Sequence, residues 1–285
     1  MKGERAPRVS VVIVNYNTRE LLLSCLRSLK RSTEDLQIVV VDNASQDGSP
    51  EAVRTAFPEV QLLALPENRG FCRGNNIGIE RSCGKYVLIL NPDTEIESST
   101  LTLMADFMDH NPEYDGCTGQ LHHPKFSGGG GTQLTCSRIP TFRFLLLQSS
   151  ALGSWLRGRR RKLWQDYNYG GWSRESDADV EVVPGSCFMM RRETFRYDER
   201  FFLYFGEESF FAQRLKAGRG WRLRYLSTAR VLHHESSSTR SRFARRIFFR
   251  DCATYIRLHF GRFAWALWWV CALPLRLWLE MRPRR

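Results

Sequence analysis

Short apolar runs and amphipathic stretches alternate along the first 110 residues of the chain. Runs of branched apolar residues, typical of strands buried on both faces, occur at 9–14, 37–42, 60–64 and 86–91. Helical spacing of apolar side chains, or a helix-start signal, predicts a helix after Asn17 with Leu22, Cys25, Leu26 and Leu29 on one face, and further helices after Ser49-Pro50, at 71–82 and around 101–108. Strands that alternate with helices at this rhythm predict an α/β fold with a mostly parallel sheet flanked by helices.

Two of these predicted strands stop abruptly at an acid and turn-forming residues. One ends at Asp42-Asn43 and the other at Asn91-Pro92-Asp93. Because ligands of such sheets bind outside the carboxyl ends of the strands, we expect Asp42 and Asp93 to lie side by side at one crevice. Two carboxylates at that place suit a ribose hydroxyl and a divalent metal. The strand ends therefore predict a sugar-nucleotide site.

The second half of the chain has a less regular pattern. Apolar runs predict strands at 180–183, 187–190, 221–225 and 229–232, and the segment 207–216 has helical character. Residues 157–162 form a basic cluster in a stretch that we expect to be irregular.

Charge is distributed unevenly between the two halves. The first 150 residues hold 15 Lys and Arg and 17 Asp and Glu, so the net charge of +12 arises entirely from the rest of the chain. From Arg240 onward there are 11 Arg and only two acids, Asp251 and Glu280. This asymmetry indicates an anionic surface partner, which is either a nucleic acid or an acidic membrane leaflet.

Cysteine usage and the N-terminus both favour a cytoplasmic setting. The eight Cys are scattered, without a Cys-x-x-Cys pair, which favours reduced thiols over disulfides or a zinc site. Residues 1–8 contain no apolar core, so we expect no secretory signal.

The C-terminal segment combines tryptophan with arginine. Residues 263–275 carry no charge and include Trp265, Trp268 and Trp269. Spanning a bilayer takes about 20 apolar residues, so this segment is too short to cross one. Its flanking arginines, among them Arg262, Arg282, Arg284 and Arg285, fit an amphipathic interfacial helix. The alternative is an ordinary terminal helix docked on the core, and the dominance of Trp and Leu argues against nucleic-acid binding.

Eight segments along the chain resemble, in order, the motifs of family 2 of the glycosyltransferases, and most of all its bacterial rhamnosyltransferase-like members. They are VSVVIVNYN (9–17), VDNASQDG (41–48), NRGF (68–71), GNNIG (74–78), LNPDT (90–94), PGSCFMMR (184–191), FFLYFGEE (201–208) and VLHHE (231–235). The resemblance covers residues 9–238 and implies a GT-A fold, a nucleoside-diphosphate sugar donor, a divalent metal and inversion at the anomeric carbon.

The resemblance implies a set of donor-binding residues in the first half of the chain. They are Asn15, Asn17, Asp42, Asp47, Asn68, Arg69, Arg73, Asn75 and Asn91. For several of these an alternative stays open. Asn15, Asn17 and Asn68 could instead cap the helices that follow them, and Asp47 could shape the turn at Gly48.

The metal site is implied by Asn91-Pro92-Asp93, which takes the place of the family's Asp-x-Asp motif with Asn at its first position. Asp93 is then the carboxylate expected to reach Mg²⁺ or Mn²⁺, which favour oxygen ligands. His233, with His234 as the alternative, resembles the family's late histidine and is expected to complete the site.

The general base is implied at Glu208, with Glu207 as the alternative, at the start of a predicted helix. The acid that the family usually has two residues later is Phe210 here, which puts the acceptor contacts in doubt.

These expectations divide the chain into a GT-A domain over 1–238 and a basic, Trp-rich helical tail over 239–285. The nucleotide-binding half of the domain is about 9–115 and the acceptor and catalytic half about 116–238. The predicted function is an inverting, metal-dependent transfer of rhamnose from dTDP-rhamnose to a glycan or lipid-linked acceptor at the inner face of the cell membrane. The alternatives are an inactive nucleotide-sugar-binding protein and a basic membrane or nucleic-acid adaptor.

Overall fold

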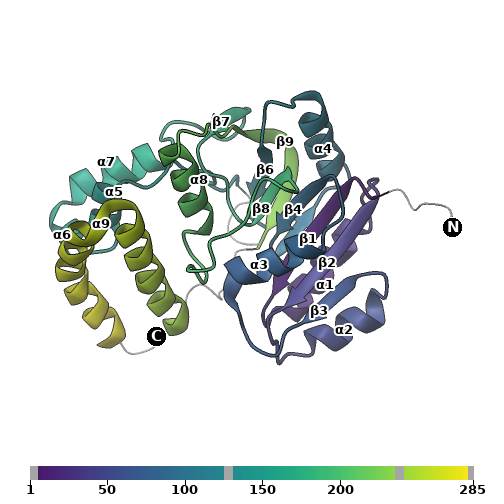
Figure 1. The fold of residues 1–285 in the computed structure, drawn as a ribbon, viewed down its shortest axis with the longest axis horizontal. Helices are drawn as coiled ribbons and strands as arrows, with labels where there is room; N and C mark the ends of the chain where they lie inside the picture. The colour runs from purple at the N-terminus through teal and green to yellow at the C-terminus, as the bar shows by residue number, and fades with distance from the viewer. Residues whose placement is uncertain (1–5, 125–130, 235–240, 282–285) are drawn as a thin grey trace.

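A mixed β-sheet runs through the computed structural model, which describes residues 6–124, 131–234 and 241–281, and helices cover both faces of the sheet (Figure 1). The described strands are β1 (Val9–Asn15), β2 (Leu36–Asp42), β3 (Gln61–Ala64), β4 (Tyr86–Leu90), β5 (Thr94–Ile96), β6 (Gly116–His122), β7 (Ala178–Val180), β8 (Cys187–Arg191) and β9 (Leu223–His233). The described helices are α1 (Arg19–Leu29), α2 (Ser49–Ala56), α3 (Gly70–Arg81), α4 (Thr100–His110), α5 (Phe142–Gln148), α6 (Leu152–Trp155), α7 (Arg157–Tyr167), α8 (Gly206–Lys216) and α9 (Arg242–Met281).

The strands are ordered β3-β2-β1-β4-β8-β6-β9-β5, with β7 also paired to β9. Strands β3, β2, β1 and β4 are parallel to one another, which confirms the parallel sheet predicted for the first half of the chain. Strand β8 then pairs antiparallel with both β4 and β6, and β6 is parallel to β9. One sheet therefore includes strands from both predicted halves of the domain, 9–115 and 116–238.

Alternate residues of β1 belong to different sides of the core. Val9, Val11 and Ile13 pack with apolar side chains of α1 and α4, whereas Val12 packs with those of α3 and α8. Helix α3 lies very close to β1, since a Cβ on Gly78 would lie 2.3 Å from a methyl carbon of Val12. The burial of β1 on both faces explains its uninterrupted apolar sequence.

Three details of the predicted secondary structure are wrong. The strands predicted at 221–225 and 229–232 are one strand, β9, whose register against β6 shifts between Gly119 and Gln120. The strand predicted at 180–183 is displaced to 178–180. Residues 157–162 are not irregular but begin helix α7, because Arg and Lys are good helix formers and Tyr167 stacks on Phe144 of α5 at 4.0 Å.

Helix α9 consists of two segments that meet at Gly261. The φ of Gly261 is +86° and its ψ is −179°, a conformation outside the helical region that glycine adopts at no steric cost. The two segments lie side by side as a hairpin (Figure 1), with Phe249 of the first near Trp268 of the second. The buried Trp268 indole donates to Ser149 Oγ at 2.7 Å. Arg282, Arg284 and Arg285, like residue 235 of the last motif, lie outside the described residues.

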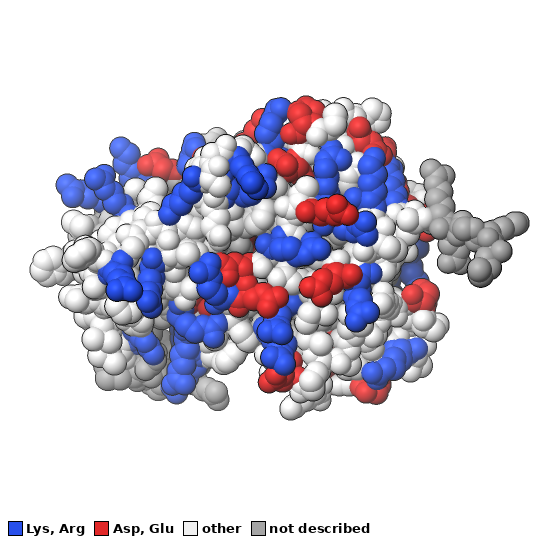
Figure 2. Space-filling view, viewed as in Figure 1, with Lys and Arg blue, Asp and Glu red and all other residues white. Residues whose placement is uncertain are grey.

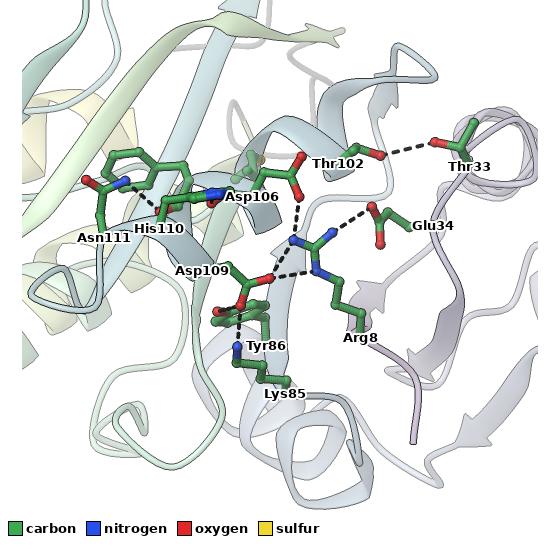
Figure 3. Close-up of polar contacts among 12 residues, drawn as sticks. Arg8, Thr33, Glu34, Lys85, Tyr86, Thr102, Asp106, Asp109, His110 and Asn111 are labelled. Atoms are coloured by element: carbon green, nitrogen blue, oxygen red, sulfur yellow. Dashed lines mark hydrogen bonds and ion pairs between the residues drawn. The ribbon is translucent and has the colours of Figure 1, made fainter. Parts of the chain in front are cut away.

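Charged side chains cluster at the amino ends of the parallel strands (Figure 3). Arg8 contacts Glu34 at 3.0 Å, Asp106 at 2.5 Å and Asp109 at 2.6 Å, and Asp109 also accepts hydrogen bonds from Lys85 and Tyr86. Burial opposes ionisation of Asp109, but these hydrogen bonds hold the pKa of its carboxyl well below the usual range. The cluster joins β1, β4, α4 and the segment before β2. It borders a large hollow at the edge of the sheet opposite to Asp42 and Asp93.

Candidate active site

The predicted site residues of the first half gather at the carboxyl ends of β1, β2 and β4. Asp42 is the last residue of β2, and Asp93 follows β4 by three residues. Both side chains are buried. They share one edge of the sheet as expected, but they are not side by side, because β1 lies between β2 and β4 and puts Asn15 opposite Asp42.

Asn15 and Asp42 are held together by a buried hydrogen bond. Asn15 Nδ2 donates to Asp42 Oδ1 at 2.8 Å and to Ser45 Oγ at 3.1 Å, while the Ser45 backbone N–H donates to Asp42 Oδ2 at 2.9 Å. Asn17 lies next to this group, with its Oδ1 accepting from the Gln46 backbone N–H. Neither asparagine caps α1 with its side chain. These contacts fix the orientation of the Asp42 side chain at the carboxyl end of β2.

Asp47 is fully engaged by the turn in which it lies. Its Oδ2 accepts from the Arg19 backbone N–H at 2.8 Å, and its Oδ1 accepts from the backbone and hydroxyl of Ser49. Although burial opposes it, these bonds lower the pKa of Asp47. The carboxylate thus ties the starts of α1 and α2 together, which favours the turn-shaping alternative for this residue.

Residues at the start of α3 border the same edge of the sheet. Asn68 Oδ1 accepts from the Gly70 backbone N–H at 2.9 Å, a bond of the capping type. The half-exposed Arg69 and Arg73 pair with Glu67 and Glu199, respectively. Each of the two arginines thus already has a carboxylate partner on the surface.

Asn75 and Asn91 differ in burial, since Asn75 is buried and Asn91 is partly exposed. Asn75 is fully buried and donates to the Phe71 carbonyl, while its Oδ1 has no hydrogen-bond partner among the described residues. The backbone N–H of Asn91 donates to Ser186 O at 3.0 Å, which joins the end of β4 to the loop before β8.

Asp93 and His233 lie together at the predicted metal position. His233 Nε2 is 3.4 Å from Asp93 Oδ1, and the backbone of Asp93 accepts from the N–H of His234. The His234 ring turns away to Glu95, 3.0 Å distant, so the geometry favours His233 over His234 as a ligand. Within the described residues no group of three or more His, Cys, Asp or Glu could hold a metal by itself. The two side chains fit a divalent cation that takes its other ligands from a diphosphate and water.

Gln133, which the sequence reasoning missed, fixes the ring of His233. Its Nε2 donates to the His233 carbonyl at 2.9 Å, so the oxygen at the other side of the amide is the atom that faces His233 Nδ1, also at 2.9 Å. An amide oxygen only accepts, so Nδ1 carries a proton. Nε2 is then the ring nitrogen that is left to bind a metal beside Asp93.

The two acids of the predicted catalytic motif lie in the first turn of α8. Glu207 is buried and accepts from the Tyr197 hydroxyl at 2.8 Å, whereas Glu208 is half-buried and accepts from Tyr167 of α7 at 3.5 Å. Burial raises the pKa of both carboxyl groups, and the charge of Glu208 raises that of Glu207 further. A carboxylate with a raised pKa is a stronger base than an ordinary glutamate.

Phe210, which stands where the family usually has an acid, packs in an aromatic cluster. Its ring packs against Phe195 at 4.3 Å and Trp221 at 5.0 Å between ring centroids. An aromatic packing role therefore replaces a polar one at this position of α8.

Solved structures of glycosyltransferases share this architecture, and the fold of the chain is the GT-A fold. A mannosyltransferase from Pyrobaculum calidifontis, in complex with GDP-Man and Mn²⁺, matches 90% of the chain with a TM-score of 0.54 and 18% sequence identity. The enzyme TarS of S. aureus, in complex with UDP, matches 88% of it with a TM-score of 0.54 and 17% identity. The chain spans just under two thirds of either structure, 64% and 65%.

The sequence profile described as Glycosyl transferase family 2 matches residues 10–197, and the chain belongs to this family. Its similarity to one curated relative extends over nearly its whole length. It is 26% identical to the N-acetylglucosaminyl-diphospho-decaprenol L-rhamnosyltransferase of Mycobacterium tuberculosis, over 93% of this chain and 87% of the relative. Glycosyltransferase AglE of Haloferax volcanii is 37% identical over a shorter region, 30% of this chain and 31% of that protein.

The contacts of Gln133 predict a loss of metal affinity in Gln133→Ala. Without the amide, the ring of His233 is free to rotate and to change tautomer, and removal of such an outer contact weakens metal binding by about 10–100-fold. Mn²⁺ affinity, measured by electron paramagnetic resonance in the presence of nucleoside diphosphate, is the direct readout. Gln37→Ala, at the opposite edge of the sheet, is the control and should bind Mn²⁺ like the parent chain. Equal affinity of both variants would contradict the assigned role.

Proposed function

We propose that the chain is an inverting, metal-dependent rhamnosyltransferase that transfers rhamnose from dTDP-rhamnose to a glycan or lipid-linked acceptor in cell-envelope polysaccharide synthesis. The observation that carries this proposal is the similarity, over nearly the whole chain, to a relative whose name specifies transfer of an L-rhamnosyl group and an N-acetylglucosaminyl-diphospho-decaprenol substrate. The proposed place of action is the cytoplasmic face of the cell membrane, with the chain bound peripherally.

The proposed reaction is a direct displacement. Glu208 removes the proton of an acceptor hydroxyl, whose oxygen forms a bond to the anomeric carbon while the bond to the nucleoside diphosphate breaks. Glu208 is preferred to Glu207 because it is half-buried, whereas the carboxylate of Glu207 is buried and engaged by Tyr197. Asp93 and His233 would hold a Mg²⁺ or Mn²⁺ ion, which when bound stabilises the negative charge of the diphosphate.

The edge formed by β1, β2 and β4 is the proposed donor pocket. The oxygens of Asp42 suit a ribose hydroxyl or a base N–H, and Asn15 keeps that carboxylate in place. Arg69 and Arg73 supply positive charge for the diphosphate. The unpartnered Oδ1 of the buried Asn75 is a further acceptor at this edge.

The tail supports the proposed contact with the membrane. From Phe263 to Trp278, the exposed residues of its second segment carry no charge. The apolar face that they form consists of Phe263, Ala266, Leu267, Val270, Leu273, Pro274, Leu277 and Trp278. Phe263 is 95% exposed and Val270 is 73% exposed, which is unusual for residues of these types. No helix among the described residues is long and apolar enough to span a bilayer. An amphipathic helix that lies in the interface accounts for the exposed apolar face.

Basic residues surround this apolar face. Residues 142–167 carry six Lys and Arg against Asp166, and residues 242–279 carry seven Arg against the buried Asp251. Figure 2 shows mostly blue among white at the end of the molecule that α7 and α9 form. Positive charge around an apolar stripe is complementary to anionic lipid headgroups.

Donor identity is tested by thermal shifts with nucleoside-diphosphate sugars, each with and without Mn²⁺. A ligand that binds only the folded chain raises its melting temperature, by an amount that corresponds to about 2.7 kcal/mol at 100 times the dissociation constant. We expect a Mn²⁺-dependent shift with dTDP-rhamnose that exceeds those with UDP- and GDP-sugars. A larger shift with another nucleotide would reassign the donor. Binding without any transfer would favour the inactive protein, and the absence of binding would favour the adaptor.

Glu208→Gln should reduce the turnover number at least about 100-fold and leave nucleotide affinity unchanged, since a general base contributes about 10²–10⁴-fold. In the parent chain, the turnover number should rise with pH as Glu207 and Glu208 lose their protons. The pH at which it reaches half its maximum should lie above the usual pKa of glutamate.

The same acids make the stability of the chain depend on pH, because a raised pKa in the folded state means that stability is lost as pH rises through that pKa. The variant should therefore lose less stability than the parent chain between pH 5 and pH 8. Glu193→Gln, an exposed acid, is the control, and normal turnover of Glu208→Gln would refute the assignment.

Membrane contact is tested with Phe263→Asp combined with Val270→Asp. Two charges in the apolar face should abolish sedimentation with vesicles that contain anionic lipid, while the melting temperature stays the same because both side chains are exposed. Leu103→Asp on α4 is the matched control. If the double variant binds vesicles like the control, the membrane does not contact this face.

A further inference from the structure

The loop that leads into the catalytic motif is held by one buried carboxylate of α9. Asp251 is fully buried, and its Oδ2 accepts the backbone N–H groups of Phe202, Leu203 and Tyr204 at 3.1, 2.9 and 3.0 Å. Its Oδ1 accepts from Nε and Nη2 of Arg250 at 3.1 and 2.9 Å. Hydrogen bonds to an ionised acceptor are about twice as strong as those between neutral groups. Asp251 therefore fixes three consecutive residues of the loop.

The loop reaches α8 through a backbone conformation that needs such support. Phe205, directly before α8, has a φ of +65°, in the left-handed region that a bulky side chain rarely adopts. Its ring packs on Phe248 and Tyr255 of α9, at 5.7 and 5.3 Å between centroids. Such backbone strain persists only where the surroundings hold it, and both sets of contacts come from the first segment of α9.

The opposite side of the loop contacts the donor half of the protein. The Phe71 backbone N–H at the start of α3 donates to Phe202 O at 2.6 Å. A Cβ on Gly70, whose φ is +82°, would lie 2.5 Å from that same oxygen. The loop is thus fixed between α3 and α9, and a shift at Phe202 would displace the first turn of α8 relative to the donor edge.

We propose that Asp251 is a positioning residue for Glu207 and Glu208: it sets the loop over 202–205, and through the loop the place and environment of the two carboxylates. The proposal rests on the proposed function of Glu208 as the base. Asp251 itself touches no reacting atom. The sequence carries one signal of this role, since Asp251 is one of only two acids from Arg240 to the end of the chain.

The experiment compares Asp251→Asn and Asp251→Ala with Arg250→Ala, at a temperature where circular dichroism finds each variant folded. Asn keeps the size and one acceptor oxygen, whereas Ala removes all three anchoring bonds. Arg250→Ala leaves those three bonds in place and removes the pair with Asp251 together with the guanidinium that lies 5.3 Å from the centre of the Phe202 ring. Hydrogen exchange at the amides of residues 202–204 should accelerate about 10-fold or more in Asp251→Ala, less in Asp251→Asn and least in Arg250→Ala.

Two further readouts separate positioning from simple destabilisation. The turnover number should fall about 10-fold or more in Asp251→Ala, with the KM for the donor within about twofold of the parent value. The titration of Glu207 and Glu208, followed by carboxyl ¹³C resonances, should move in the same variant, because their burial and mutual repulsion change. Asp251→Asn should recover part of both effects.

Each contrary result has a distinct meaning. Faster exchange with unchanged turnover and an unchanged glutamate titration would make Asp251 a structural anchor only, and the proposal would be wrong. An equal loss of turnover in Arg250→Ala would assign the effect to the contacts of Arg250 with Asp251 and with the Phe202 ring instead of the three backbone hydrogen bonds, and would also overturn the proposal. If the parent chain transfers no sugar, the proposed function fails, while the exchange rates and the titration still decide whether Asp251 positions the acids.

Discussion

The pairing of β4 determines where every part of the site lies. This strand is parallel to β1 on one side and antiparallel to β8 on the other, so the end of β4 meets the beginning of β8 at one edge of the sheet. The Asn91 backbone N–H joins the two at Ser186. The loop before β8 then runs directly against α8, where a Cβ on Gly185 would lie 2.1 Å from Glu207 Oε1. The change of strand direction at β4 therefore brings the donor edge and the acid pair to the same end of the sheet.

Buried polar contacts hold the segments that this sheet brings together. Asn15 orients Asp42, Gln133 orients His233, and Asp251 holds the loop before α8. Hydrogen bonds to charged groups contribute about 1.5–3 kcal/mol each, and an unsatisfied buried partner costs a similar amount. Asn15 and Gln133 each fix a side chain that is proposed to bind donor or metal, whereas Asp251 fixes the backbone that leads to the two glutamates. Loss of these contacts would loosen the site while the apolar core stays intact.

The parts of the fold that depend on local sequence could be predicted. Asp42 and Asp93 were placed at one edge because branched apolar runs end there, and the order of the motifs indicated Glu207 and Glu208. Gln133 was missed because only the long-range return of β9 places it beside His233, 100 residues later. Helix α7 was missed because it is basic nearly all round and has no apolar periodicity. Asp47 was ambiguous because a turn acid has the same sequence pattern whether it binds a ligand or the backbone.

Two separate chains of contacts connect the tail to Glu207 and Glu208, so the tail is part of the support of the site and not an independent appendage. One route passes from the first segment of α9 through Asp251 and the loop to the start of α8. The other passes from the second segment, where Trp268 donates to Ser149 after α5, to Phe144, which stacks on Tyr167, the donor to Glu208. The apolar face that we propose to lie on the membrane points away from both routes, since Trp268 is buried and Phe263 and Val270 are exposed. One helical hairpin can thus contact lipid with its outer face and support, with its inner face, the loop and the helices that hold Glu208 on α8, which would couple membrane contact to the position of the base.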